Sequence, residues 1–215
     1  TSHSGPPRIT IIIPTAITGM PVLERAIESL ERYANLPDRD LIVIDNGSLD
    51  NTPEFLNKLK REKFMNIRVI TNTANEGFGH AVNQGMKVAT GKYVLVMHND
   101  VSLNNDAPGM LADILDDHDD ISHIGPIAET VFNEAQRRRA IDPDPSVLKR
   151  VPYIDSFFML IRRESSVRFD ERYGLSWFED MDYGMTDAKK GGQAAIAPGV
   201  KVNHLGSYTL SLMGR

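Results

Sequence analysis

The sequence of 215 residues contains no cysteine. Disulfide bonds and thiolate metal sites are therefore excluded, and a reducing compartment is permitted. Long apolar runs are missing as well, because no segment approaches the ~20 apolar residues that span a bilayer, and no signal peptide is recognisable. These absences predict a chain without a transmembrane segment, placed in the cytoplasm and peripheral to a membrane only through regions outside this sequence.

Positive charge is in short supply. Lysine and arginine together number 24, against 29 aspartate and glutamate residues, so the formal net charge is -5. A protein that binds nucleic acid through a broad basic face is therefore not expected. A small anionic ligand remains compatible with this charge, provided that local backbone N–H groups or a metal ion meet it.

The remaining composition is ordinary for a soluble globular protein. Hydrophobic residues make up 41% of the chain and charged residues 25%, and this length is enough to bury a core. The first residues, Thr-Ser-His-Ser-Gly-Pro-Pro, lack a methionine. We interpret residues 1–8 as a linker or a vector-derived remnant, and we expect a single domain over 9–215 that is part of a longer protein.

Strand and helix patterns alternate through the first half of the chain. Residues 9–13 (ITIII) form a β-branched run typical of a strand that is covered on both faces. Further strands are expected at 41–44, 67–70 and 93–97, and helices at 22–34, at 53–60 with Thr52 as N-cap, and at 79–89. This rhythm predicts an α/β fold with a doubly wound, mostly parallel central sheet flanked by helices.

The second half is less regular. Helices are expected at 108–116 and 181–190, and a strand at 157–161 (FFMLI). Residues 133–150 are polar and contain Arg137, Arg138 and Arg139, so we interpret them as a long surface loop whose arginines are solvated.

Polar clusters follow the four strands of the first half. They are Pro14-Thr15-Ala16, the segment DNGSLDNT from Asp45 to Thr52, the segment NEGFG from Asn75 to Gly79, and His98-Asn99-Asp100. The carboxyl ends of strands in an open α/β sheet are where such folds bind ligands. The four clusters therefore predict one binding site at that edge.

Two of these clusters suit a nucleotide. Asp45 can accept a hydrogen bond from a base or a ribose hydroxyl, or alternatively make only an Asx-type turn with Ser48. The glycines of the NEGFG segment let the backbone approach an anion at a helix N-terminus, unless they form a plain turn. A dinucleotide fingerprint is absent after the first strand, as is a phosphate-binding loop with its Gly-Lys-Ser/Thr ending.

Acidic or imidazole side chains at three places in the sequence suit metal binding or proton transfer. Asp100 can bind a divalent cation, although a polar strand cap is the alternative. Glu179, Asp180 and Asp182 follow the aromatic pair Trp177-Phe178, and a carboxylate in such a partly apolar cleft can act as a general base. The alternative is a set of acids that stabilise a helix N-terminus. A lone histidine such as His204 is more often structural than a ligand.

In this order the motifs strongly resemble the family-two glycosyltransferases with the A-type fold, from Ile9 to about Ser207. The motifs are IIIPT at 11–15, IDNGSLDNT at 44–52, NEGFG at 75–79 with Asn83 and Gly85, HND at 98–100, FEDMD at 178–182, and His204. The resemblance implies a nucleotide-sugar-binding half over 9–100 and an acceptor and catalytic half over 101–215.

The resemblance also implies roles for individual residues. Asp180 is the expected catalytic base with Glu179 beside it, Asp100 and His204 are the expected metal ligands, and Trp177 and Asp182 are expected to meet the acceptor. The donor is expected to contact Pro14, Thr15, Ala16, Asp45, Asn46, Ser48, Asn75, Gly77, Phe78, Asn83, His98 and Asn99.

The implied activity is an inverting transfer of a sugar from a nucleoside diphosphate sugar, with UDP or dTDP favoured, to a hydroxyl of a glycan or other acceptor, with Mn²⁺ or Mg²⁺ as cofactor. One departure stands out, because His98 replaces the first acid of the usual Asp-x-Asp metal motif. The alternative is therefore a catalytically degenerate module that binds a nucleotide sugar or glycan. A nucleotidyltransferase is disfavoured because the loop after the first strand has no lysine or arginine before Arg25.

Overall fold

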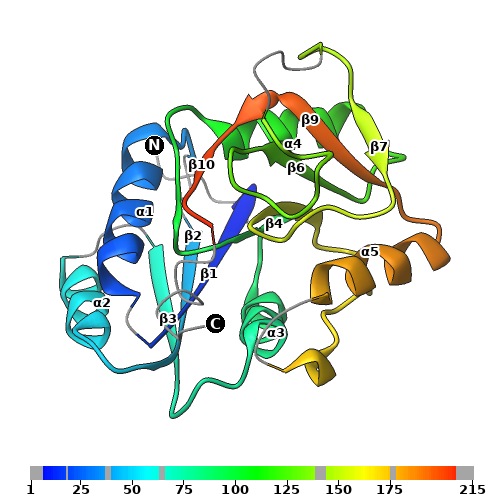
Figure 1. The fold of residues 1–215 in the computed structure, drawn as a ribbon. Helices are drawn as coiled ribbons and strands as arrows, with labels where there is room; N and C mark the ends of the chain where they lie inside the picture. The colour runs from blue at the N-terminus through cyan, green and yellow to red at the C-terminus, as the bar shows by residue number, and fades with distance from the viewer. Residues whose placement is uncertain are drawn as a thin grey trace.

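The computed structural model describes residues 7–17, 19–36, 40–62, 66–138, 144–174 and 178–206. Strands and helices alternate over the first half and become irregular after it (Figure 1). The elements are β1 (Ile9–Ile17), α1 (Met20–Tyr33), β2 (Asp40–Ser48), α2 (Thr52–Arg61), β3 (Asn66–Asn72), α3 (Phe78–Val88), β4 (Tyr93–Met97), β5 (Val101–Ser102), α4 (Ala107–Asp117), β6 (His123–Ile127), β7 (Lys149–Val151), β8 (Phe158–Arg162), the 3-10 helix η1 (Glu171–Tyr173), α5 (Glu179–Lys189), β9 (Ala194–Lys201) and β10 (Asn203–His204).

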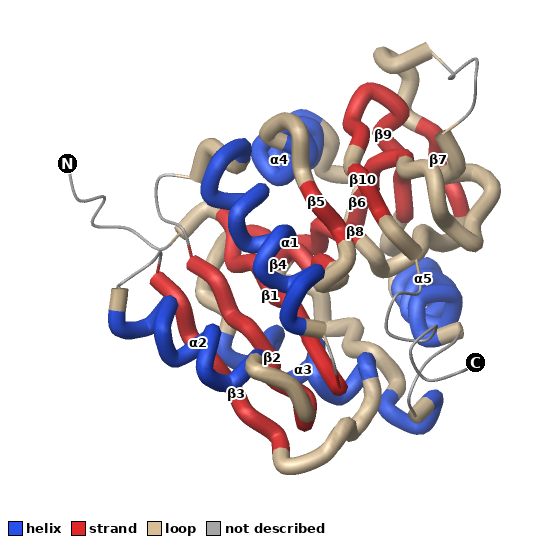
Figure 2. Tube along the Cα trace, turned by 60° about the vertical axis from the view of Figure 1, so that its left-hand side comes forward, coloured by secondary structure: helices blue, strands red, loops and turns tan. Residues whose placement is uncertain are grey.

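An eight-stranded sheet with the order β3-β2-β1-β4-β8-β6-β9-β7 runs through the whole domain. The pairs β1–β2, β2–β3, β1–β4 and β6–β9 are parallel, whereas β8 runs antiparallel to both β4 and β6. Figure 2 shows β3, β2 and β1 side by side. The order of the strands reverses between β1 and β4, and such a switch point opens a crevice at the carboxyl ends of the strands.

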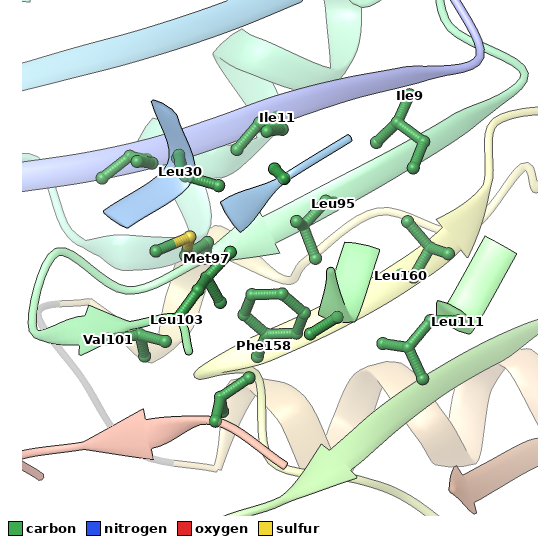
Figure 3. Packing of buried hydrophobic residues seen from close by; sticks show 14 of the residues in the cluster. Ile9, Ile11, Leu30, Leu95, Met97, Val101, Leu103, Leu111, Phe158 and Leu160 are labelled. Atoms are coloured by element: carbon green, nitrogen blue, oxygen red, sulfur yellow. The ribbon is translucent and has the colours of Figure 1, made fainter. Parts of the chain in front are cut away.

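The continuous apolar run of β1 is explained by burial on both faces of the sheet. Ile9, Ile11 and Ile13 pack into a core with helices α1, α2 and α4, whereas Ile12 packs into a second core with α3 and α5. Figure 3 shows part of the first core, where Ile11 lies near Leu30 of α1. Because successive side chains of a strand point to opposite faces, the two cores hold the sheet in the middle layer.

The predicted α/β class and the mostly parallel sheet flanked by helices are confirmed, and the differences lie at the ends of elements. β1 continues through Pro14 to Ile17, and the residue at the N-cap of α2 is Asn51 instead of Thr52. Pro7 accepts a hydrogen bond from the backbone of Lys92, so the ordered contacts begin before residue 9. The pairing of β1 with β4 ends at Ile12, so Pro14 lies where β1 has a partner strand on one side only. A proline is tolerated at such an edge position.

The interpretation of residues 133–150 as a long surface loop is wrong for part of that stretch. Asn133 and Gln136 are buried, Arg137 bridges to Ala128, and β7 begins at Lys149. Two strands of the second half, β6 (HIGPI) and β9 (AAIAPGVK), escape prediction because each contains glycine and proline, which usually interrupt strands. Arg139 lies outside the described residues.

None of the helices that the structure describes has the length and apolar character needed to cross a membrane.

Candidate active site

The carboxyl ends of β1, β2 and β4 bring three of the four polar clusters together. Thr15 of β1 is the register partner of Asp45 of β2. On the other side, Thr15 Oγ1 accepts a hydrogen bond of 3.0 Å from the side chain of Asn99, which follows β4. Asn99 directly precedes Asp100 in the chain. The buried side chains of Thr15 and Asn99 therefore connect Asp45, the candidate for binding the base, to the candidate metal ligand Asp100.

Asp45 uses one carboxylate oxygen for a turn. Its Oδ1 accepts the backbone N–H of Ser48 at 3.0 Å, which is the Asx-type turn that was the alternative interpretation. Its other oxygen, Oδ2, has no hydrogen bond from the described residues. The turn therefore fixes the side chain of Asp45, which is 2% exposed, and leaves one oxygen for a ligand.

Asn46 shapes the neighbouring loop. Its amide donates to Oδ1 of Asn75 at 2.9 Å and to the carbonyl of Gly77 at 3.2 Å, and its Oδ1 accepts from the side chain of Asn72 and the backbone of Glu76. The side chain of Asn46 is thus occupied by the segment that it holds in place. The NEGFG loop is consequently formed in advance of any ligand.

Gly77, in this loop, cannot be replaced by another amino acid without strain. Its φ is 96°, and an added Cβ would lie 2.0 Å from the carbonyl oxygen of Gly174. We expect Gly77→Ala to lower the free energy of unfolding by more than about 2 kcal/mol, as measured by urea unfolding. Gly191→Ala is the matched control, since Gly191 has a φ of 90° but no described atom within 4 Å of the added Cβ. Equal losses in the two variants would contradict this account.

Phe78 and Asn83, at the start and middle of α3, lie in different surroundings. The ring of Phe78 packs edge-on against that of His98, with 5.1 Å between centroids. Asn83 instead exchanges hydrogen bonds with the backbone of Phe169 and donates to Glu171. It also lines a separate cleft of ≈ 680 Å³. Phe78 therefore belongs to the strand-end site, and Asn83 anchors the segment before η1.

The metal candidates form a compact group. One ligand atom from each of His98, Asp100 and His204 lies within 4.8 Å of the other two. Two very short strands bring His204 there, because β10 pairs with β5 and places His204 opposite Val101. Backbone pairing of two-residue strands thus unites residues that are about a hundred positions apart.

The surroundings of the two imidazoles suit a cation. Burial lowers the pKa of His98 to about 4 against the opposing charge of Asp100, so this imidazole is neutral at pH 7. His204 donates from Nδ1 to the carbonyl of Thr130 at 2.6 Å, because a carbonyl oxygen can only accept. This hydrogen bond turns Nε2 of His204 toward Asp100, 3.3 Å from Oδ1.

These residues fit a divalent metal ion. Nε2 of His98 and of His204 are buried, and neither has a hydrogen-bond partner among the described residues. A histidine that holds a metal usually gives its other N–H to a backbone carbonyl, as His204 does to Thr130. Two imidazole nitrogens and one carboxylate are a suitable ligand set for Mn²⁺ and an acceptable one for Mg²⁺.

Asp180 lies at the start of α5 in the surroundings expected of a general base. Burial, followed by the charge of Asp155, raises the pKa of Asp180 to about 6, although backbone N–H groups of Met181 and Ser156 oppose the shift. Those hydrogen bonds measure 2.8 and 3.4 Å. Phe178, with a φ of 69°, lies in the left-handed region just before the helix, and such backbone strain is common at functional sites.

The other acids of this motif differ in burial. Glu179 is 8% exposed, and Asp182 lies in the same first turn. Trp177, which we expected at the acceptor, lies outside the described residues.

The segment 155–157, which precedes β8, was not predicted as part of the site, and Phe157 was expected only as a strand residue. Since β8 runs antiparallel to β4, its first residue, Phe158, pairs with the last residue of β4, Met97. The preceding residues therefore arrive at the carboxyl edge of β4, beside the metal candidates. Ser156 reaches Asp180, and the ring of Phe157 stacks on His204 with 4.6 Å between centroids. The signal that the sequence offered for this part of the site was the polar pair Asp155-Ser156, directly before an apolar strand.

Comparisons with known proteins agree with this geometry. The model of the family "Glycosyl transferase family 2" matches residues 10–178. The poly-beta-1,6-N-acetyl-D-glucosamine synthase of Staphylococcus epidermidis is 35% identical over 75 residues, which are 34% of this chain and 17% of that protein. The matched part is therefore about a sixth of the length of this relative.

Solved structures show the same fold. A mannosyltransferase from Pyrobaculum calidifontis, in complex with GDP-Man and Mn²⁺, aligns with a TM-score of 0.72 and 17% identity over 94% of this chain and 57% of that one. TarS of S. aureus, in complex with UDP-GlcNAc, aligns with a TM-score of 0.67 and 18% identity over 91% and 58%. The family match covers most of the sequence and the solved structures share the A-type architecture, so the chain belongs to glycosyl transferase family 2.

Proposed function

We propose that this chain transfers a sugar from a nucleoside diphosphate sugar to a hydroxyl group of an acceptor, with inversion at the anomeric carbon. One observation carries the proposal. A carboxylate with a raised pKa, Asp180, and a candidate metal cluster, His98, Asp100 and His204, both contact the three-residue segment 155–157. A base and a cation site that contact the same short segment suit a sugar transfer, in which the cation site meets the diphosphate and the base meets the attacking alcohol.

The donor is proposed to lie along the carboxyl edge of β1, β2 and β4. The second oxygen of Asp45 accepts the imide N–H of uracil or thymine, so UDP and dTDP sugars are favoured. The preformed loop 75–77 and the end of β1 at Thr15 and Ala16 surround the nucleoside. In support, loop 75–77 is held by Asn46, and Thr15 is held by Asn99.

The transfer itself depends on Asp180. Its carboxylate accepts the proton of the acceptor hydroxyl while the oxygen of that hydroxyl forms a bond to the anomeric carbon. The bond between the anomeric carbon and the diphosphate oxygen breaks on the opposite face, and the nucleoside diphosphate leaves with the bonding electrons. A general base of this kind contributes about 10²–10⁴ in rate.

Asp100 and His204, with His98 beside them, are proposed to hold Mn²⁺ or Mg²⁺. When bound, a divalent cation stabilises the negative charge that develops on the departing diphosphate. The neutral state of His98 favours this role, because a protonated imidazole would repel the cation.

The acceptor is proposed to be a glycan, as in polysaccharide assembly. The printed name of the S. epidermidis relative, a polysaccharide synthase, supports the proposal. Asp182 in the first turn of α5 is close to Asp180 along the helix and is proposed to meet acceptor hydroxyls.

A panel of nucleotide sugars tests the function. With Mn²⁺ present, we expect a UDP or dTDP sugar at a concentration of 100 Kd to increase the free energy of unfolding by about 2.7 kcal/mol. The melting temperature of the protein should rise accordingly. Donor consumption is then measured with and without a glycan acceptor. A transferase consumes the donor faster when the acceptor is added. Stabilisation without any consumption would identify a binding module, and no stabilisation by any member would contradict the proposal.

A further inference from the structure

Asp155 directly precedes the two residues that contact the base and the metal cluster. The residue after it contacts Asp180 through a backbone N–H, and the second residue after it stacks on His204. The charges agree with this position, since Asp155 raises the pKa of Asp180 after the larger effect of burial. Asp155 therefore lies near the base, on the segment that also contacts the metal cluster.

One oxygen of Asp155 is fixed by the protein. Oδ2 accepts the backbone N–H groups of Phe132 and Asn133, at 2.8 and 2.9 Å. The backbone N–H of Asp155 in turn donates to the buried side chain of Gln136 at 2.5 Å. These three hydrogen bonds tie Asp155 to the loop that also supplies the carbonyl of Thr130 to His204. The carboxylate consequently has a defined orientation before any ligand arrives.

The other oxygen is left for a ligand. Asp155 is 6% exposed, and its Oδ1 accepts no hydrogen bond from the described residues. A carboxylate oxygen that is largely removed from water and lacks a donor costs free energy. A hydroxyl group placed there would satisfy it, and hydrogen bonds to a charged acceptor are among the stronger ones.

We propose that Asp155 binds a hydroxyl group of the transferred sugar and selects against donors that carry a carboxylate. The inference rests on the proposed function, because a diphosphate at the metal cluster and an alcohol at Asp180 place the sugar between them, at Asp155. A neutral hexose donates a hydroxyl to this oxygen. A uronic acid brings a second negative charge into the same partly desolvated space and is repelled.

Calorimetry with three probes, UDP, UDP-glucose and UDP-glucuronic acid, tests this proposal in the presence of Mn²⁺. The two sugars differ only in a CH₂OH group against a carboxylate. We expect the wild type to prefer UDP-glucose over UDP-glucuronic acid by about ten- to hundredfold. In Asp155→Asn that preference should fall at least tenfold, whereas the affinity for UDP alone should stay within about twofold.

The substitution and its control separate the charge of Asp155 from the stability of the loop. Asparagine retains one oxygen for the N–H groups of Phe132 and Asn133 but carries no charge. Asn133→Ala removes both side-chain hydrogen bonds of Asn133, to the carbonyl of Tyr153 and from the backbone of Ala135, and so loosens the same loop. It keeps the backbone N–H that donates to Asp155. The preference for UDP-glucose should persist in Asn133→Ala.

The outcomes separate the inference from the function on which it rests. An unchanged preference in Asp155→Asn would overturn the role of Asp155 while wild-type binding of UDP still supported the donor site. Loss of the preference in both variants would assign the effect to the loop and would likewise overturn it. A wild type that binds none of the three probes would contradict both proposals.

Discussion

Asp180→Asn is expected to lower kcat for sugar transfer by about 10²–10⁴ while the affinity for the donor stays within a few-fold of the wild type. Asparagine occupies the same space and accepts the backbone N–H of Met181, yet it cannot take a proton from the acceptor. Initial rates of transfer and calorimetric donor binding, measured on the same preparations, check the two halves of this expectation.

The pH dependence gives the same substitution a second readout. Because the pKa of Asp180 is raised to about 6, the wild-type kcat/KM should fall as the pH drops through that value and the base becomes protonated. Asp180→Asn should lose this acidic limb.

The stability of the variant provides the control. A carboxylate whose pKa is raised in the folded state destabilises the folded protein in full above about pH 6, and this cost shrinks to nothing as the pH falls from about 6 to the ordinary pKa of 3.8. At pH 8, Asp180→Asn should therefore unfold at no lower urea concentration than the wild type. Asp182→Asn, in the same helical turn, removes a proposed contact with the acceptor and should therefore raise the acceptor KM while changing kcat less than tenfold. Turnover of Asp180→Asn within tenfold of wild type, or equal losses in the two variants, would show that these acids only stabilise the helix terminus.

Asp100→Ala is expected to abolish the part of donor binding that depends on metal. Asp100 is 7% exposed and supplies the carboxylate of the His98, Asp100 and His204 group, so its removal leaves only the two imidazoles. The affinity for UDP in the presence of Mn²⁺ should fall at least about a hundredfold. Calorimetric titration with and without EDTA separates the metal-dependent part from the rest.

An exposed acid provides the control for charge. Asp113 on α4 has a side chain that is 70% exposed and pairs with Arg8, so Asp113→Ala changes the net charge equally. It should leave UDP affinity unchanged at both metal conditions. If Asp100→Ala bound UDP with Mn²⁺ as tightly as Asp113→Ala does, the metal assignment would be wrong.

The donor side of the site was predictable from the sequence because parallel strands share an edge. Once residues 9–13, 41–44 and 93–97 are recognised as strands, the polar clusters after them must meet. Thr15, Asp45 and Asn99 do meet, through register pairing and one hydrogen bond. Alternating burial on two faces explains why their apolar runs were so clear.

The catalytic side depended on long-range pairings without a sequence signal. His204 reaches Asp100 through the two-residue strands β5 and β10, which are too short to show any periodicity. Asp155 reaches the site because β8 is antiparallel to β4, and the direction of a strand cannot be read from its own residues. The resemblance to a known family, and not local pattern, carried the prediction for His204.

Some residues that were predicted to contact the donor also hold neighbouring segments of the protein in place. The amide of Asn46 is occupied by loop 75–77, and the amide of Asn83 by the segment 169–171. A motif records that a residue type is needed at a position, but it does not distinguish a side chain that touches the ligand from one that holds a neighbouring loop.

Crystals soaked with Mn²⁺ and UDP, with anomalous diffraction collected near the manganese edge, test the central claim most directly. We expect one strong anomalous peak at coordination distance from Asp100 and His204, with the uracil ring beside Asp45. A peak bound elsewhere on the protein, or UDP bound away from the carboxyl ends of β1, β2 and β4, would contradict the account.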